Sequence, residues 1–398
     1  MSNSRVLLHL SLIAGVGSGT ALRLLRRYIE PKASTARYLL SGEGVELVEL
    51  YSFSVRMFMA QFGCSELIAT RLTVGLRDMD LLSNEEQLLA SNPQIRFISI
   101  LESDYPESLR EILIPPVILY MQGTALPPIS RALAVVGARA AGDYARAVVK
   151  HLLPPIVRAG WSIVSGGALG VDAMAHAAAV ETGGHTTVVL GSGLLNWYPA
   201  PNFPLFDEVL ARNGTIISAF RLQEQPLAKN FPARNRIISG LSRGCLLISA
   251  SAKSGSRITA EFALEQGKSV FAAPGSIFDP LSEGSHALIA QGARLVSSAQ
   301  DIFDEFCIEY EVPSDHGTHY QQAIADVPQQ RVVMPIPVVA TPQNVSPLMQ
   351  ALVAPSSFDE LCVKTGIPFG ELHAELFDLQ LAGVVTQNYA GLWERVAS

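Results

Sequence analysis

Cysteine and metal-binding motifs are scarce in this chain of 398 residues. Its four cysteines (Cys64, Cys245, Cys307 and Cys362) lie far apart and form no C-x-x-C pair, which argues against a disulfide framework and against a zinc site. The eight histidines form no H-E-x-x-H motif and no cluster with cysteine. We therefore expect no metal, no cofactor and a reducing, cytoplasmic environment.

Charged residues and long apolar runs are also limited. Only 16% of the residues are charged and 48% are hydrophobic, which is typical of a globular protein with a substantial core. No run of about 18 apolar residues occurs, so we expect no membrane-spanning helix. The segment 6–16 resembles a short secretory signal. Because His9 interrupts it and an amphipathic helix follows, we favour a soluble N-terminal domain.

The net charge of −7 would disfavour a nucleic-acid partner if the charges were evenly spread. They are not, because the segment 221–257 carries one acidic residue, Glu224, against a group of basic residues. These are Arg221, Lys229, Arg234, Arg236, Arg243, Lys253 and Arg257. A polyanionic partner is therefore compatible with the sequence.

Changes along the chain predict four regions. Residues 1–95 have apolar residues at helical spacing, and residues 96–310 alternate short apolar runs with amphipathic helices. Residues 311–347 include a proline-rich stretch and are interpreted as a linker. Residues 348–398 resume helical spacing and end in two short strand candidates, which is a winged-helix outline.

The second region contains six strand candidates with helical stretches between them. They are 132–136, 161–165, 186–190, 215–218, 245–249 and 269–273. This alternation predicts βαβ units in a doubly wound parallel sheet, an α/β fold of the Rossmann-like kind. Ligands of such sheets bind beyond the carboxyl ends of the strands, where this chain has its glycine-rich turns.

The turn Gly15-Val16-Gly17 between the first two predicted helices has two interpretations. It could belong to a helix-hairpin-helix, whose backbone N–H groups contact a phosphate. A plain helix turn is the favoured interpretation.

Two strand ends carry residues that suit an anion. The first strand ends in Gly137, and Arg139 follows; glycine lets a ligand approach the backbone, and arginine binds phosphate through two N–H groups. The second ends in Ser165, Gly166 and Gly167, whose N–H groups could form a phosphate-binding nest. The structural alternatives are an arginine that packs over the sheet edge and a tight turn without a ligand.

The strongest local signal begins at Lys229. This lysine, Arg234 and Arg236 could neutralise phosphates, while Phe231 offers a flat surface on which an unpaired base stacks. Pro232 suits the first turn of a helix, so the two arginines should lie near its N-terminus, where a cation is unfavourable unless it serves an anion. A further turn, Ser254-Gly255-Ser256, could offer hydroxyl and N–H groups to phosphate or simply cap a helix.

A series of longer motifs lies between residues 98 and 300. It includes Tyr105-Pro106-Glu107-Ser108-Leu109, Val136-Gly137-Ala138-Arg139, Ser165-Gly166-Gly167-Ala168, Leu190-Gly191-Ser192-Gly193, Tyr198-Pro199, the stretch 231–242, Ser254-Gly255-Ser256 and Ala273-Pro274-Gly275. Through these motifs the chain resembles the DNA-processing protein A family (DprA, also called Smf). The resemblance implies an extended Rossmann fold between a sterile-alpha-motif-like helical domain and a winged-helix domain.

The resemblance also implies a function. Members of that family bind single-stranded DNA during natural transformation, protect it and help to load the RecA recombinase, usually as homodimers through the Rossmann domain. No catalytic activity is established for the fold, so we expect no enzyme. The candidate DNA-binding residues are Gly137, Arg139, Ser165, Gly166, Gly167, Lys229, Phe231, Arg234, Asn235, Arg236, Ser254, Gly255 and Ser256.

Three residues depart from many relatives. Ala219 and Ser249 stand where glutamate is common, and His286 stands where asparagine is common. The loss of two carboxylates from strand ends should make the pocket less negative and favour phosphate. The departures would equally fit a divergent member with a different partner.

Two alternatives remain beside this interpretation. Phosphoribohydrolases share a Rossmann-like architecture, but their P-G-G-x-G-T-x-x-E signature is absent and no paired carboxylates indicate a general acid and base. The C-terminal domain could read double-stranded DNA. Its candidate recognition helix carries Glu371, Glu375 and Asp378 and no lysine or arginine, so we favour a protein-contact module.

Overall fold

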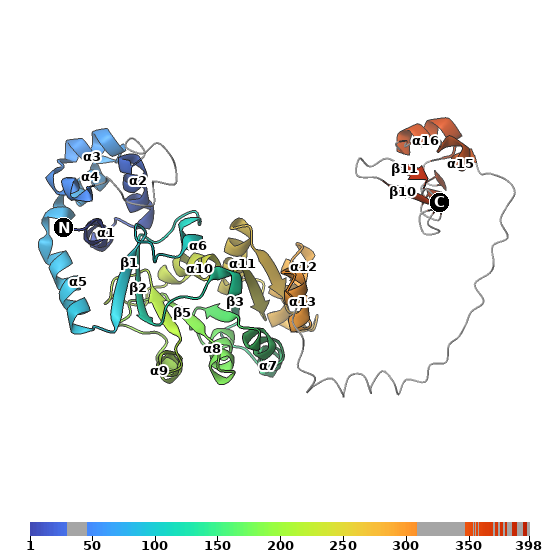
Figure 1. Ribbon diagram of the computed structural model, residues 1–398. Coiled ribbons are helices and arrows are strands. Elements are labelled where there is room, and N and C mark those ends of the chain that lie inside the picture. The colour runs from blue at the N-terminus through green and yellow to red at the C-terminus, as the bar shows by residue number, and fades with distance from the viewer. Residues whose placement is uncertain are drawn as a thin grey trace. The chain divides into compact units, whose positions relative to one another are not determined.

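The computed structural model describes residues 1–29, 46–308 and parts of 347–395 (Figure 1). The chain folds as two compact units, Met1–Pro313 and Ser314–Ser398. Most of the predicted linker, 311–347, lies outside the described residues. Within the described part of the chain, no helix combines the length and the apolar character needed to cross a membrane.

Helices make up the start of the first unit, as its apolar spacing predicts. They are α1 (Asn3–Leu12), α2 (Ser18–Ile29), α3 (Val55–Phe62), α4 (Glu66–Arg77) and α5 (Met79–Ser91), with the 3-10 helix η2 at Leu47–Ser52. Ser2 caps α1 by accepting a hydrogen bond from the N–H of Arg5, and Ser54 caps α3 in the same way. Gly63 ends α3 in the left-handed conformation, with φ of 59°.

A nine-stranded sheet follows, in the order β1-β2-β6-β5-β4-β3-β7-β8-β9. Its strands are β1 (Ile95–Ser99), β2 (Ile118–Gly123), β3 (Ala132–Gly137), β4 (Ser162–Ser165), β5 (Thr186–Leu190), β6 (Thr215–Ser218), β7 (Gly244–Ile248), β8 (Ser269–Ala272) and β9 (Arg294–Leu295). In this sheet order, all neighbours from β6 through β5, β4, β3, β7 and β8 to β9 pair in parallel. The strand β2 pairs antiparallel with both β1 and β6. The predicted α/β fold with a doubly wound parallel sheet is confirmed.

Three strands of this sheet have no clear signal in the sequence. Exposed and buried residues do not alternate along β1, and β2 buries its first four residues in succession. The strand β9 has only two residues. The sequence predicts strands only from residue 132 onward, because only there do short apolar runs alternate regularly with helical stretches.

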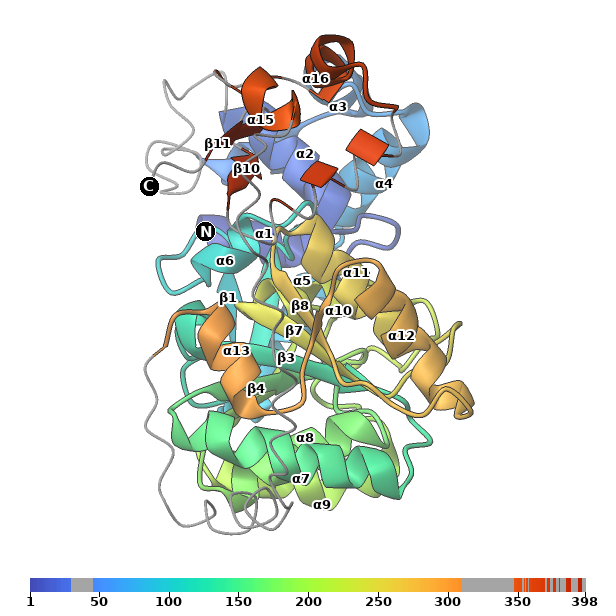
Figure 2. The same ribbon diagram turned by 90° about the vertical axis from the view of Figure 1, so that its right-hand side faces the viewer.

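Different helices cover the two faces of the sheet (Figure 2). They are α7 (Asp143–Arg158), α8 (Val171–Glu181), α9 (Phe203–Ala211), α10 (Asn230–Gly240), α11 (Gly255–Glu265), α12 (Glu283–Ala290) and α13 (Ala299–Glu305). Leu133 and Val135 of β3 join a core with α7, α8 and α13, whereas Ala134 and Val136 join the core that contains α10 and α11. Burial of both faces explains the continuous apolar runs of the central strands.

The second unit contains α15 (Pro347–Ala351), α16 (Phe358–Thr365), β10 (Val385–Gln387) and β11 (Trp393–Arg395). The two strands form an antiparallel hairpin. A buried apolar cluster holds the unit together: Leu348, Leu352, Leu361, Leu372, Leu376 and Val385. Helices followed by a hairpin agree with the predicted winged helix. Of the acidic residues in its candidate recognition helix, Glu371 and Glu375 are described, and Asp378 lies outside the described residues.

Candidate nucleic-acid interface

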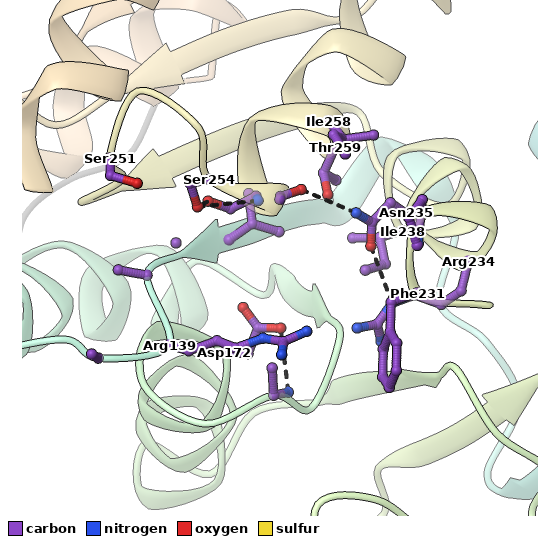
Figure 3. Close-up of a pocket in the computed structure, with 18 of the residues that line it drawn as sticks. Arg139, Asp172, Phe231, Arg234, Asn235, Ile238, Ser251, Ser254, Ile258 and Thr259 are labelled. Carbon is purple, nitrogen blue, oxygen red and sulfur yellow. Dashed lines mark hydrogen bonds between the residues drawn. The ribbon is translucent and has the colours of Figure 1, made fainter. Parts of the chain in front are cut away.

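The sheet has a topological switch point between β3 and β7. The chain proceeds from β3 toward β4 on one side and from β7 toward β8 on the other, and the crevice at such a point binds ligands in doubly wound folds. A cavity of about 530 Å³ lies at the carboxyl ends of these strands. We call it the switch-point pocket. Its lining includes residues 136–140, Ala168, Asp172, Phe231, Pro232, Arg234, Asn235, Ile238, Ser251, Ser254, Gly255, Ser256, Ile258 and Thr259 (Figure 3).

Arg139 provides the exposed positive charge of this pocket. Its guanidinium carbon lies 5.4 Å from the centre of the Phe231 ring. Neither a hydrogen bond nor an ion pair of this side chain occurs among the described residues. Two residues before it, Gly137 has no room for a side chain, since a Cβ there would collide with the carbonyl oxygen of Ile248 and with Val171. Glycine is required at 137 for strand packing, while Arg139 remains available to an anion.

Phe231 forms an aromatic surface beside Arg139 (Figure 3). Its ring is half-buried and lies 5.8 Å from the ring of Tyr198, with an angle of 57° between the planes. The Tyr198 residue is 44% exposed, so it adds a second accessible ring. Gly191 gives the Phe231 ring room, because a Cβ there would lie 2.9 Å from it. Sequence reasoning did not place Tyr198 in the site, although an aromatic residue in the turn after a central strand was an available signal.

Arg234 has a structural position rather than an exposed one. It is 4% exposed, and its guanidinium donates hydrogen bonds to the backbone carbonyls of Gly166 and Val189. Burial lowers the pKa of Arg234 to about 10, although the charge of Asp172 opposes this shift. Arg234 therefore fastens the ends of β4 and β5, and it also lines the switch-point pocket, so its contact with a bound anion stays a prediction.

Backbone N–H groups of the loop after β4 are bonded within the protein. The Asp172 carboxylate accepts hydrogen bonds from the N–H groups of Gly166 (3.1 Å) and Ala168 (3.4 Å). Ser165 donates its hydroxyl to the carbonyl of Val135, and Gly167 is buried with φ of +66°. Burial raises the pKa of Asp172, and the charge of Arg234 acts in the opposite direction. The nest predicted for a phosphate thus holds an internal carboxylate.

The N-terminus of α11 borders the switch-point pocket on the side of Ser254 (Figure 3). Ser254 caps the helix by accepting a hydrogen bond from the N–H of Ser256, and the two hydroxyls lie 2.7 Å apart. Asn235 of α10 donates to the carbonyl of Gly255 at 3.3 Å, which ties the two helices together. Hydroxyl groups and the free N–H groups of a helix start therefore face the space beside Arg139.

Lys229 and Arg236 do not line this pocket. They line a second recess of about 570 Å³, which we call the hairpin groove. Its other lining residues are 11–19 in the α1–α2 turn, Ile114, Val117, Ile118, residues 219–221, Glu224, Asn230, Ala233 and Ile237. The structure thus divides the predicted residues into an open set at the switch point, a buried set after β4 and a set in the hairpin groove.

The three departures from the family pattern also lie apart. Ala219 lines the hairpin groove, whereas the Ser249 hydroxyl donates to the carbonyl of Leu281 at 3.4 Å. His286 lies 3.0 Å from the carbonyl oxygen of Gly275 through Nε2. The expectation that positions 219 and 249 relieve negative charge in one common pocket is therefore wrong. In the described part of the chain, no group of three histidine, cysteine or acidic residues is placed to hold a metal ion.

Fold and site together define a doubly wound α/β protein with an arginine, two rings and a helix N-terminus at the carboxyl ends of its central strands. A family model described as DNA recombination-mediator protein A matches residues 96–307, and one described as the DprA winged helix domain matches residues 340–391. The chain belongs to the DNA recombination-mediator protein A family.

Relatives support this assignment. The DNA processing protein DprA of Bacillus subtilis (strain 168) is 44% identical over 212 residues, which cover 53% of this chain and 71% of that protein. Protein Smf of Escherichia coli (strain K12) is 37% identical over 283 residues, 70% of this chain and 72% of that protein. The X-ray structure of DprA from Streptococcus pneumoniae gives a TM-score of 0.63 at 33% identity and covers 78% of this chain and 99% of that chain. The predicted family and the winged-helix domain are confirmed.

Proposed function

We propose that the switch-point pocket binds single-stranded DNA. Arg139 and the start of α11 contact backbone phosphates, and Phe231 and Tyr198 contact unpaired bases. A stacked base leaves its hydrogen-bonding edge free, so such a site accepts many sequences.

One observation carries this proposal: Arg139 lies against an accessible aromatic ring and has no carboxylate partner among the described residues. Two other arginines differ in this respect, since Arg221 pairs with Glu224 at 2.7 Å and Arg257 with Glu261 at 3.7 Å. An unneutralised guanidinium beside a ring matches the two contacts that single strands use, phosphate neutralisation and base stacking.

A hydrolytic function receives less support. The carboxylate that lines the pocket belongs to Asp172, which is 7% exposed and bonded to the loop after β4. A general base must reach the proton that it removes, and a general acid and base pair needs a second group. We therefore assign the pocket to binding and propose no catalytic step.

The wider role follows from family membership. We propose that this protein protects incoming single-stranded DNA in the cytoplasm, acts as a homodimer through the Rossmann-like domain and helps to load RecA. The description of the family as recombination mediators supports this role. Two further expectations stay predictions. One is the domain boundary at residue 95, and the other is that the C-terminal domain contacts a protein.

The test is a fluorescence-anisotropy titration of the full chain with labelled oligo-deoxythymidine and with a duplex of the same length. We expect tighter binding to the single strand and a steep loss of affinity with added salt. A nucleotide-hydrolysis assay on the same protein tests the alternative enzyme. Equal affinity for both DNA forms, or no binding, would contradict the proposal, and turnover of a nucleotide would favour the enzyme.

A further inference from the structure

The hairpin groove carries positive charge that has no counterion among the described residues. Arg236 donates from Nε to the carbonyl of Ile114 at 2.8 Å and from a second nitrogen to the carbonyl of Ala233. Both acceptors are neutral, and no carboxylate pairs with Arg236 within the described ranges. Burial lowers the pKa of this guanidinium, as expected for a partly desolvated cation. Glu224, the acidic residue in the lining, is already paired with Arg221.

The opposite wall of the groove, residues 11–19, contains three glycines. Gly15 needs to be glycine because its φ is +79°. Gly17 and Gly19 are different, because both are exposed and have no positive φ. A Cβ at 17 would meet nothing within 4 Å, and one at 19 would meet only Ile114 at 3.9 Å. Neither space nor backbone conformation requires glycine at these two positions, and glycine there would let a ligand chain lie close to the backbone.

The first turn of α10 joins the two recesses. Phe231, Arg234 and Asn235 line the switch-point pocket, while Lys229 and Arg236 line the hairpin groove. Lys229 is exposed and occupies the N-cap position of α10, directly before the residues of both sets. A DNA single strand that crosses this turn would meet Lys229 there and Arg236 farther along the groove.

We propose that the hairpin groove holds the sugar-phosphate backbone of the same single strand, next to the nucleotides in the switch-point pocket. The proposal rests on the function proposed above and extends it. Lys229 and Arg236 neutralise two further phosphates, and the Gly17–Gly19 wall lets the backbone lie close. The helical region thereby becomes part of the DNA-binding surface rather than a separate module.

A charge placed on the glycine-containing wall tests this path. Gly17→Glu adds a carboxylate where a side chain meets no steric obstacle, and Ser83→Glu adds the same charge at an exposed position of α5 outside both recesses. Both variants and the wild type are titrated with oligo-deoxythymidines from about 4 to about 16 nucleotides, the range of site sizes of single-strand binding domains. Thermal unfolding of each protein checks that it is folded.

We expect Gly17→Glu to bind the longest strand about tenfold more weakly than the wild type, because like charges repel, and to bind the shortest strand equally well. Ser83→Glu should match the wild type at every length. In the wild type, the log–log salt slope should steepen by about 1.4 from the shortest to the longest strand, for two added phosphates.

Other results separate this proposal from the one on which it rests. Wild-type binding with no effect of Gly17→Glu at any length overturns the groove and leaves the switch-point pocket intact. If Gly17→Glu weakens binding equally at all strand lengths, the proposal that the groove binds additional nucleotides is also overturned. If Gly17→Glu fails to fold, the salt slopes decide, and a slope that does not change with length is the contrary result. No binding by the wild type at any length overturns both proposals.

Discussion

The turns after β3 and β4 have similar composition and opposite electrostatic outcomes. Both combine small residues at the end of a central strand with a nearby arginine. After β3, Arg139 stays exposed beside the Phe231 ring. After β4, the N–H groups of Gly166 and Ala168 are bonded to a buried carboxylate.

The difference lies in the helix that follows each turn. The helix after β4 has Asp172 in its first turn, and its carboxylate reaches back to the loop, where Arg234 supplies the opposing charge. The helix after β3 has Asp143 in its first turn, and among the described residues its carboxylate accepts no hydrogen bond from the β3 turn. The N–H groups of Gly166 and Ala168 in the turn after β4 are thus occupied by an internal carboxylate, whereas the proposed anion contact belongs to the turn after β3.

The largest effect that tests this comparison is on stability. Arg234→Ala should lower the free energy of unfolding by about 3–5 kcal/mol, because it leaves Asp172 buried without its countercharge and two carbonyls without a donor. Urea denaturation followed by circular dichroism measures this change. Arg139→Ala is the matched control, and we expect a change within about 0.5 kcal/mol. Equal stability of the two variants would show that the two turns do not differ in this way.

Acid should weaken the β4 side selectively. Burial lowers the pKa of His176 in α8 to about 3, below the value of about 6.5 for an unfolded chain. The unfolded state therefore binds more protons between these values, so stability falls as the pH drops through that window. From pH 7 to pH 5 we expect His176 to contribute a loss of about 2 kcal/mol.

The measurement is urea denaturation at several pH values for the wild type and for His176→Gln. The variant should be less stable at neutral pH if the contact of Nδ1 with Thr186 is lost, but its stability should depend less on pH. His185, whose pKa burial lowers to about 4, contributes a similar dependence that persists in both proteins. Parallel pH curves for the two proteins would argue against a neutral, buried His176.

Much of the fold was predictable because it depends on local periodicity. The six strands from β3 to β8 follow from short apolar runs, and the helices between them follow from helical spacing of apolar residues. The apolar runs are continuous because both faces are buried, as Leu133 and Val135 on one face and Ala134 and Val136 on the other show. The strands β1, β2 and β9 were missed because β1 and β2 precede the regular alternation of strands with helices and β9 has only two residues. Their place in the sheet depends on pairing between distant segments, which periodicity does not encode.

The site was predictable only in part, for a similar reason. Residue type and position at strand ends identified Arg139, Phe231 and Ser254, which the structure brings to one pocket. The same reasoning could not separate Arg234 from Arg236, since both are arginines in the first turns of one helix. Burial decides their roles, and burial of a side chain depends on which tertiary contacts form around α10.

Among binding effects, the ring should matter most. Phe231→Ala should weaken binding to oligo-deoxythymidine by about 1–3 kcal/mol if a base stacks on it. Phe231→Leu is the sharper variant, since it keeps an apolar side chain against Arg139 and Gly191 but removes the flat face. We expect both variants to lose affinity in anisotropy titrations. Retention of wild-type affinity by the leucine variant would mean that Phe231 acts only through packing.

The smallest effect should come from Arg139 itself, and it separates the two turns most directly. Arg139→Ala should weaken binding by about 1.5 kcal/mol, the lower range for a hydrogen bond to a charged group, and reduce the log–log salt slope by about 0.7, for one phosphate. Arg139→Lys keeps the charge and should retain the slope while losing part of the affinity, because lysine lacks the paired N–H groups of arginine. Titrations at several salt concentrations measure both quantities. An unchanged slope in the alanine variant would mean that the turn after β3, like the one after β4, does not bind an external anion.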